Sequence, residues 1–253
     1  MIRTSQLTKT FPDGTVALHG IDLHVARGEA VVLLGSNGSG KSTLLRCLTR
    51  LLEPTSGTVQ IGGVDAGQAD GRELRAVRRR TGIVFQDINL VEQVSVLTNV
   101  LHGQLGRHAH PRQWFGLSAS RDSRDRAMHC LDRVRLSDFA GRRADQLSGG
   151  QRQRVALARV LMQQPDVILA DEPVAALDPR AGREVMDLLW GIVEEEQLTL
   201  VCTLHQLELA RTYGQRIVGL RDGRTVLDRS REDFTDADVA ALYEDRPTAG
   251  AAR

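Results

Sequence analysis

The stretch Glu29-Ala-Val-Val-Leu-Leu-Gly-Ser-Asn-Gly-Ser-Gly-Lys41-Ser42 decides the fold of this chain. Its first half is short, apolar and rich in β-branched residues, and it stops at Gly35, so we expect a buried strand. Leucines then recur at helical spacing from Lys41 as far as Leu52, and Pro54 ends this helical pattern. The glycine-rich turn between strand and helix matches the pattern G-x-x-x-x-G-K-S/T, which predicts a phosphate-binding loop.

The predicted loop has a defined chemistry. Its glycines let backbone N–H groups converge on phosphate oxygens at the start of a helix, where the helix dipole favours anions. Lys41 is expected to reach the β- and γ-phosphates of a nucleotide, and the Ser42 hydroxyl to coordinate Mg²⁺. We also expect this lysine to be exposed and to add little to stability. The predicted nucleotide-binding residues of the loop are Gly35, Ser36, Asn37, Gly38, Ser39, Gly40, Lys41, Ser42 and Thr43.

Composition limits what the rest of the chain can be. Its 253 residues are 41% hydrophobic and 26% charged, which supports a real core and excludes intrinsic disorder for most of the chain. A formal net charge of +1 argues against a general nucleic-acid binder. Cys47, Cys130 and Cys202 lack metal-ligand spacing, so we expect reduced core thiols in a cytosolic protein. No run of about 18 apolar residues predicts a membrane span, and no secretory leader is expected.

Strand and helix patterns alternate along the chain, which predicts an α/β fold with a largely parallel sheet. The stretch 87–143 differs because it has few strand signals, and we expect it to be a mostly helical insertion. We expect residues 1–245 to form a single domain and 246–253 a disordered tail. Within the insertion, 121–134 predicts a helix with Ala127, Cys130, Leu131 and Val134 on one face. Further predicted strands are 81–85, 166–170, 198–203 and 216–220, and further helices are 150–163, 179–195 and 206–213.

A second motif, Val167-Ile-Leu-Ala-Asp171-Glu172, ends a predicted buried strand with two adjacent carboxylates. Taken alone, such a pair is most often a solvated turn. A phosphate-binding loop, however, requires an acid for Mg²⁺, and Asp171 fits that role. Glu172 is suited to orient or polarise an attacking water.

A third motif, Leu147-Ser-Gly-Gly-Gln151, resembles a family signature. Together with the phosphate-binding loop, LSGGQ resembles the ATPases of ATP-binding cassette (ABC) transporters. Gln86, in Val84-Phe85-Gln86, resembles the Q-loop of that family, and Ala175-Ala-Leu-Asp178 resembles its D-loop. The resemblance covers about residues 1–228, and its elements follow in the family's order.

Two further positions carry the resemblance. His205, after a predicted strand, is similar to the family's switch histidine, and Phe11 is similar to the aromatic residue that stacks on adenine. The family often has tyrosine at the latter position, but stacking uses the ring face, which phenylalanine keeps. The D-loop commonly begins with serine, whereas this chain has Ala175, which removes one hydroxyl contact across a dimer. The resemblance implies a P-loop NTPase core of the ABC type, with an N-terminal antiparallel β part and an inserted helical subdomain.

The resemblance also implies a head-to-tail dimer, in which each ATP lies between the phosphate-binding loop of one copy and LSGGQ of the other. It implies Glu172 as general base or water-positioning residue and His205 as a contact to the γ-phosphate. It implies that Ser42, Gln86 and Asp171 serve the Mg²⁺ ion. The ATP contacts implied beyond the loop are Phe11 and Gln86 in the same copy and Ser148, Gly149, Gly150, Gln151 and Asp178 from the second copy.

The segments 11–23, 95–103 and 202–206 look like the ATP-binding subunits of phosphonate importers. The segment 103–123 resembles the same subfamily through its aromatic pair Trp114-Phe115, although such a pair is also a common packing plug. The resemblance implies transmembrane permease subunits as partners and, through them, a periplasmic or extracellular substrate-binding protein. It implies a peripheral position on the cytoplasmic face of the membrane and no nucleic-acid partner.

Other classes remain as alternatives. An importer ATPase for another small anion or for an amino acid differs only in the permease that it joins. A soluble ABC ATPase of DNA repair needs a long coiled coil, for which the interval from Gln86 to Leu147 has no room, and translation types carry two cassettes in one chain. A P-loop kinase or GTPase is disfavoured by LSGGQ.

Overall fold

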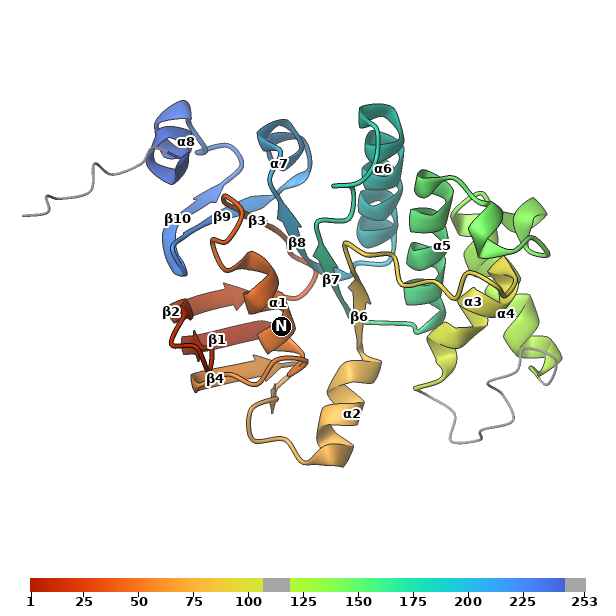
Figure 1. The fold of residues 1–253 in the computed structure, drawn as a ribbon, viewed down its shortest axis with the longest axis horizontal. Helices are drawn as coiled ribbons and strands as arrows, with labels where there is room; N and C mark the ends of the chain where they lie inside the picture. Colours follow the sequence, from red (N-terminus) through yellow and green to blue (C-terminus); the bar gives the residue numbers. More distant parts are fainter. Residues whose placement is uncertain (107–118, 244–253) are drawn as a thin grey trace, which may run out of the picture.

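The structure, a computed structural model, describes residues 1–106 and 119–243. Figure 1 shows two sheets with helix α1 (Lys41–Leu48) between them and further helices on the other side of the larger sheet. The tail expected at 246–253 and the pair Trp114-Phe115 lie outside the described residues. Among the described helices, none has the length and apolar character needed to cross a membrane.

The larger sheet has the strand order β10-β9-β3-β8-β7-β6. β3 pairs in parallel with β8 and β9, and β7 pairs in parallel with β8 and β6, whereas β10 forms an antiparallel hairpin with β9. The prediction of a largely parallel sheet is therefore confirmed. The strands are β3 (Ala30–Leu34), β6 (Thr81–Val84), β7 (Val167–Asp171), β8 (Thr199–Leu204), β9 (Arg216–Arg221) and β10 (Arg224–Ser230).

The smaller sheet is antiparallel, with the order β2-β1-β4-β5, as the family resemblance implied. Gly57 is required where β4 passes β1, because its φ is +86° and a Cβ there would lie 2.3 Å from the carbonyl oxygen of Gln6. The strands are β1 (Ile2–Thr10), β2 (Val16–Val25), β4 (Ser56–Ile61) and β5 (Val64–Asp65).

Two apolar clusters lie on opposite faces of β3, which explains its uninterrupted apolar sequence. Val31 and Leu33 pack in a cluster that contains leucines of α1 and residues of the antiparallel sheet. Val32 and Leu34 pack in the other cluster, which contains residues of α5, α6 and α7. The remaining helices are α2 (Gly71–Arg79), α3 (Val96–Leu101), α4 (Arg121–Arg133), α5 (Gly149–Met162), α6 (Pro179–Glu195), α7 (Leu207–Tyr213) and α8 (Asp236–Tyr243), and the 3-10 helix η1 spans His102–Gln104.

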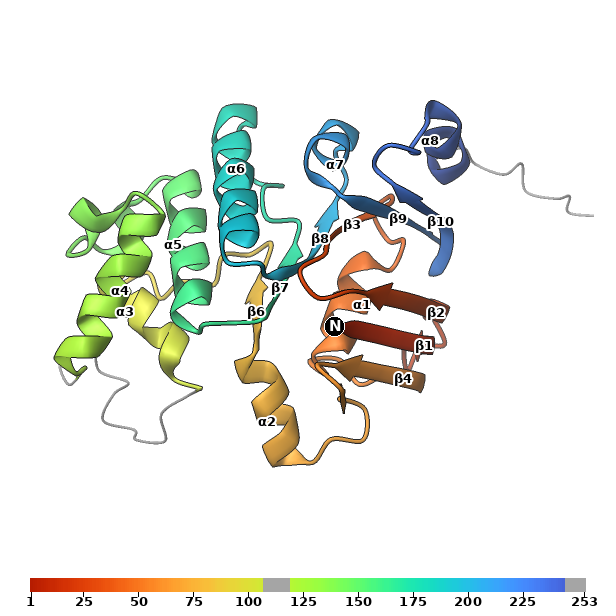
Figure 2. The ribbon, with the colours of Figure 1, turned by 180° about the vertical axis from the view of Figure 1, so that it is seen from behind.

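The predicted insertion is mostly helical where the structure describes it, with α3, η1 and α4 joined by irregular stretches such as 87–95. Figures 1 and 2 both show α3 and α4 beside α5, on the side of the molecule away from the antiparallel sheet. The face of α4 that contains Ala127, Cys130 and Leu131 is buried, together with Val134 just after the helix, as predicted. Cys47, Cys130 and Cys202 are free and buried, as expected for core thiols. The single-domain prediction for 1–245 stays a prediction.

The predicted extent of α1 is wrong. The helix ends at Leu48, and Leu51, which was expected on its apolar face, is 51% exposed. Arg50 adopts a left-handed conformation with φ +53°, and its N–H bonds to Cys47 O while that of Leu51 bonds to Arg46 O. This is a Schellman end, in which an arginine occupies the position that glycine usually takes.

Candidate nucleotide-binding site

The phosphate-binding loop, residues 35–42, connects β3 to α1, as predicted. Gly40 precedes the helix with φ +102°, and a Cβ there would lie 2.7 Å from the carbonyl oxygen of Ala17. Gly38 has φ +81° and open space around it, so the loop backbone is accessible at this point. The loop therefore has the tight turns and the exposed backbone that a phosphate cradle requires.

Lys41 begins α1 and is only 4% exposed, so the expectation of an exposed lysine is wrong. Its ammonium donates to the carbonyl oxygens of Gly35 at 2.8 Å and Ser36 at 3.0 Å, and Nζ lies 3.8 Å from Oε1 of Glu172. Burial lowers the pKa of Lys41, and the charges of Glu172 and Asp171 partly oppose that shift. A cation held inside the loop is available to phosphate oxygens that enter it.

Asp171 ends β7 and meets Ser42 across the loop. The Ser42 hydroxyl donates to Asp171 Oδ1 at 2.8 Å, and the Thr203 hydroxyl donates to the same oxygen at 3.0 Å. Asp171 is 4% exposed. A hydroxyl and a carboxylate are hard oxygen ligands of the kind that Mg²⁺ takes together with nucleotide phosphates, so the donor set fits this ion.

Glu172 lies between two nitrogen-bearing side chains. Its Oε2 is 3.5 Å from Nδ1 of His205, which follows β8, and its Oε1 faces Lys41. Its backbone is left-handed, with φ +45°, and its N–H donates to Thr203 Oγ1 at 2.8 Å. The carboxyl ends of β7 and β8 thus bring both predicted catalytic residues to the loop.

A cavity of about 350 Å³ lies at this loop. Gln86, just after β6, and Glu172 line it together with the loop from Asn37 onward, whereas Gly35 and Ser36 do not line it. The structure thus brings together the predicted loop, the Q-loop and Glu172. The lining residues are Ala17, Asn37, Gly38, Ser39, Gly40, Lys41, Ser42, Thr43, Gln86 and Glu172.

The other predicted ATP contacts do not line this cavity. Ser148 begins α5 with a capping box, in which its hydroxyl accepts from Gln151 N and its own N–H donates to Gln151 Oε1. Asp178 similarly accepts from two backbone N–H groups at the start of α6. Gly149 and Gly150 pack against the D-loop region, because a Cβ on either would lie 3.2 Å from a side chain there. LSGGQ therefore packs against the D-loop and the first turn of α6 and forms one face with them.

Phe11 lies in the turn that follows β1, apart from the residues that line the cavity. The Lys9 ammonium lies 5.5 Å from the centroid of the Phe11 ring, within the range of a cation–π contact. The ring is half-buried.

Sequence reasoning missed two residues of the site. Thr203 contacts both acidic residues, and its signal was a single polar side chain near the end of the apolar run 198–204. Ala17 of β2 lines the cavity, but it reaches the loop only through the packing of the two sheets, for which the sequence has no local signal.

A glycine-rich phosphate-binding loop and an acid at the end of a neighbouring parallel strand define a P-loop nucleotide-binding protein. The chain belongs to the ABC transporter family, whose model matches residues 18–175.

Relatives and solved structures agree with this assignment. The chain is 56% identical to the phosphate-import ATP-binding protein PhnC of Mycolicibacterium smegmatis, over 94% of this chain and 90% of the relative. It is 49% identical to the phosphonates import ATP-binding protein PhnC of Nocardia farcinica, over 96% of this chain and 90% of the relative. The dimeric ATP-binding cassette MJ0796, solved in a post-hydrolysis state with ADP and Pi, is 37% identical, with a TM-score of 0.79 over 92% of this chain and all of that one.

The predicted ABC ATPase fold is therefore confirmed, as is the resemblance to phosphonate-importer ATPases. The roles assigned to individual residues stay predictions.

Proposed function

We propose that this chain is the ATP-hydrolysing subunit of a phosphonate importer, held by a permease at the cytoplasmic face of the membrane. One observation carries the hydrolytic part of the proposal: Lys41, Ser42, Asp171, Glu172 and His205 meet at the phosphate-binding loop. The names of the relatives support the cargo.

The residues of the cavity would share the work of hydrolysis. The loop N–H groups and Lys41 would hold the β- and γ-phosphates of ATP, with the ammonium leaving its two carbonyl partners. Ser42, Asp171 and Gln86 would hold Mg²⁺, which when bound supplies neutralising charge to the phosphates. Glu172 would orient the attacking water and accept its proton, and His205 would donate a hydrogen bond to the γ-phosphate.

A second copy of the chain would complete the site. Within the described residues, Ser148–Gln151 and Asp178 lie outside the cavity of their own chain, on the face made by the starts of α5 and α6. In a head-to-tail pair, the N–H groups at the start of α5 would face the γ-phosphate held by the other copy. Phe11 would stack on the adenine. The dimeric state of MJ0796 supports this arrangement.

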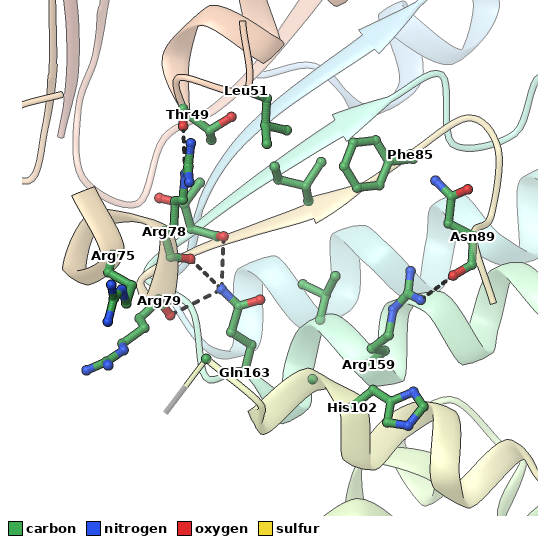
Figure 3. Close-up of a pocket in the computed structure, with 15 residues that line it drawn as sticks. Thr49, Leu51, Arg75, Arg78, Arg79, Phe85, Asn89, His102, Arg159 and Gln163 are labelled. Carbon is green, nitrogen blue, oxygen red and sulfur yellow. Dashed lines mark hydrogen bonds between the residues drawn. The ribbon is translucent and has the colours of Figure 1, made fainter. Parts of the chain in front are cut away.

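A groove between α2, β6, η1 and α5 is the proposed docking site of the permease. Its volume is about 450 Å³. Figure 3 shows Leu51 and Phe85 lying together, with Arg159 and His102 across the groove. Phe85 directly precedes Gln86, so adjacent residues of one segment reach the groove and the nucleotide cavity. A change in the position of Gln86 on nucleotide binding would therefore act directly on Phe85 in the groove.

The positive charge along the groove favours a partner segment that carries carboxylates. Arg75 and Arg79 of α2 line it and form no ion pair with any described residue, and no carboxylate lines it. Arg78 and Arg159 are held by backbone carbonyl oxygens, at Thr49 and Asn89 among others (Figure 3). An apolar floor with a cationic edge fits a cytoplasmic segment of the permease that carries apolar side chains and carboxylates.

Cargo uptake in the source cells tests the proposed function. Cells in which Lys41→Ala replaces the wild-type chain are compared with wild type for uptake of a radiolabelled alkylphosphonate and of orthophosphate. Arg27→Ala, which removes an exposed cation that does not line the cavity, is the control. We expect alkylphosphonate uptake to fail and orthophosphate uptake to persist. The reverse pattern would make phosphate the cargo, as the name of the Mycolicibacterium smegmatis relative suggests. Unchanged uptake of both would refute both cargoes.

A further inference from the structure

Thr203 connects the two acidic residues of the site through one hydroxyl. It lies on β8 directly opposite Asp171 of β7 and is completely buried. Its Oγ1 accepts the N–H of Glu172 at 2.8 Å and donates to Oδ1 of Asp171 at 3.0 Å. The hydrogen bonds therefore run in one direction, from the Glu172 N–H through the threonine hydroxyl to the Asp171 carboxylate.

The backbone of Glu172 depends on an anchor of this kind. Its φ of +45° places it in the left-handed region, which residues with a side chain rarely adopt. This turn directs the Glu172 carboxylate toward Lys41 and His205 rather than along the strand. Because Thr203 holds the N–H at the turn, it acts on where that carboxylate points.

The same hydroxyl also fixes the other carboxylate. Asp171 Oδ1 accepts from Ser42 as well as from Thr203, so two hydroxyls on different elements define its orientation. Ser42 is the residue expected to turn to Mg²⁺ when the ion and nucleotide bind, and Thr203 would then remain as the fixed partner of Asp171.

We propose that Thr203 is a positioning residue for ATP hydrolysis, setting the Asp171 carboxylate toward the metal and the Glu172 carboxylate toward the attacking water. The proposal rests on the roles proposed for those two acids. It assigns Thr203 no contact with ATP. The alternative is that its hydroxyl only stabilises the fold, and an experiment must distinguish this role from positioning of the two carboxylates.

The chain offers a matched control on the same strand. Thr199 is also completely buried, lies on the same face of β8 four residues earlier, and accepts a backbone N–H, that of Gly28, at 3.0 Å. It lies at the opposite end of β8 from His205. Thr199→Val and Thr203→Val both remove a hydroxyl that accepts a backbone N–H, with the same change of shape, one far from the site and one within it; Thr203→Val also removes the hydrogen bond to Asp171.

The experiment uses the purified full chain and three readouts: the unfolding midpoint without nucleotide, the affinity of the ATP-loaded chain for Mn²⁺ by electron paramagnetic resonance, and steady-state kcat and KM for ATP. We expect both valine variants to lose stability, Thr203→Val more than Thr199→Val because it removes two hydrogen bonds rather than one. Only Thr203→Val should weaken Mn²⁺ binding and lower kcat, each by about 10- to 100-fold, while KM for ATP stays unchanged. Thr203→Ser, which keeps the hydroxyl, should restore both, and Thr203→Ala replaces the valine variant if that fails to fold.

Two outcomes would overturn the assignment. Equal kcat and Mn²⁺ affinity in Thr203→Val and Thr199→Val would leave Thr203 with a structural role only. Failure of Thr203→Ser to restore activity would mean that packing of the methyl group, not the hydroxyl, matters. A wild-type chain that neither binds Mn²⁺ with ATP nor hydrolyses it would refute the proposed function itself, which separates the two failures.

Discussion

The nucleotide cavity and the groove differ in the chemical character of the residues that line them. The cavity is polar and is formed by a continuous loop together with the ends of strands. At these ends, the Asp171 carboxylate and the Glu172 N–H bond to hydroxyls of Ser42 and Thr203 at 2.8 to 3.0 Å. The groove has an exposed leucine, a half-buried phenylalanine and arginines without acidic partners among the described residues. Apart from the buried Ser39 hydroxyl, the buried polar groups around the cavity are paired within the chain, whereas the groove presents apolar and cationic surface that a partner would satisfy.

The largest expected effect is at Glu172, the residue on which the hydrolytic role of the cavity depends. Glu172→Gln keeps the side-chain shape but cannot accept a proton, so we expect ATP turnover to fall about 100- to 10,000-fold while ATP still binds. The variant should accumulate as an ATP-bound dimer in sedimentation velocity. Glu208→Gln, which changes an exposed carboxylate on α7, is the control and should turn over normally. Normal turnover in Glu172→Gln would contradict the assignment of the base.

Lys41 tests whether the cavity requires a compact cation. Its ammonium fits between two carbonyl oxygens in a buried position, so both Lys41→Ala and the bulkier Lys41→Arg should weaken ATP binding, by about 10- to 100-fold. Stability should change much less, because the cost of burying the charge, which lowers the pKa of Lys41, offsets its two hydrogen bonds. Isothermal titration with ATP and thermal unfolding separate these effects. Wild-type affinity in Lys41→Arg would show that any cation suffices.

Charge reversal on α2 tests the groove. Arg75→Glu and Arg79→Glu should each weaken association with the detergent-solubilised permease by about tenfold, because a carboxylate on the permease would meet a like charge. ATP affinity of the isolated chain should stay unchanged. Arg72→Glu is the matched control, since Arg72 is exposed on the same helix but does not line the groove. If all three variants weaken permease association equally, only the net charge of α2 matters, and the groove is not the docking site of the permease.

The same contrast explains what the sequence could predict. The loop, Asp171 and Glu172 belong to contiguous motifs, and the geometry of strand, turn and helix follows locally from them. Thr203 and Ala17 reach the site only through strand register and sheet packing, which no short motif encodes. The end of α1 was misplaced because Arg50 takes a position that glycine usually marks.

The groove was not predicted at all, since its residues come from the end of α1, from α2, η1 and α5, and from β6 and the segment after it. One of them, α2, was also missed, although Asp70 and Glu73 form the capping box that opens it. That box was a readable local signal, because an acidic N-cap followed three residues later by glutamate typically begins a helix. Finding α2 from it would still not have placed the helix beside β6 and α5. Local patterns thus define the elements, and the groove arises only from how they pack.

The smallest expected effect is at Leu51, which the Schellman end of α1 leaves 51% exposed in the groove. Leu51→Ser should change the free energy of unfolding by less than about 0.5 kcal/mol, because the side chain gains little burial in the isolated chain. It should weaken permease association by about fivefold, since docking would bury that apolar surface. Val226→Ser, an exposed apolar residue on β10 outside the groove, should change neither quantity. A Leu51→Ser variant that loses stability but still binds the permease would mean that Leu51 stabilises the fold, and the contrast between a cavity paired within the chain and a groove left for a partner would fail at that residue.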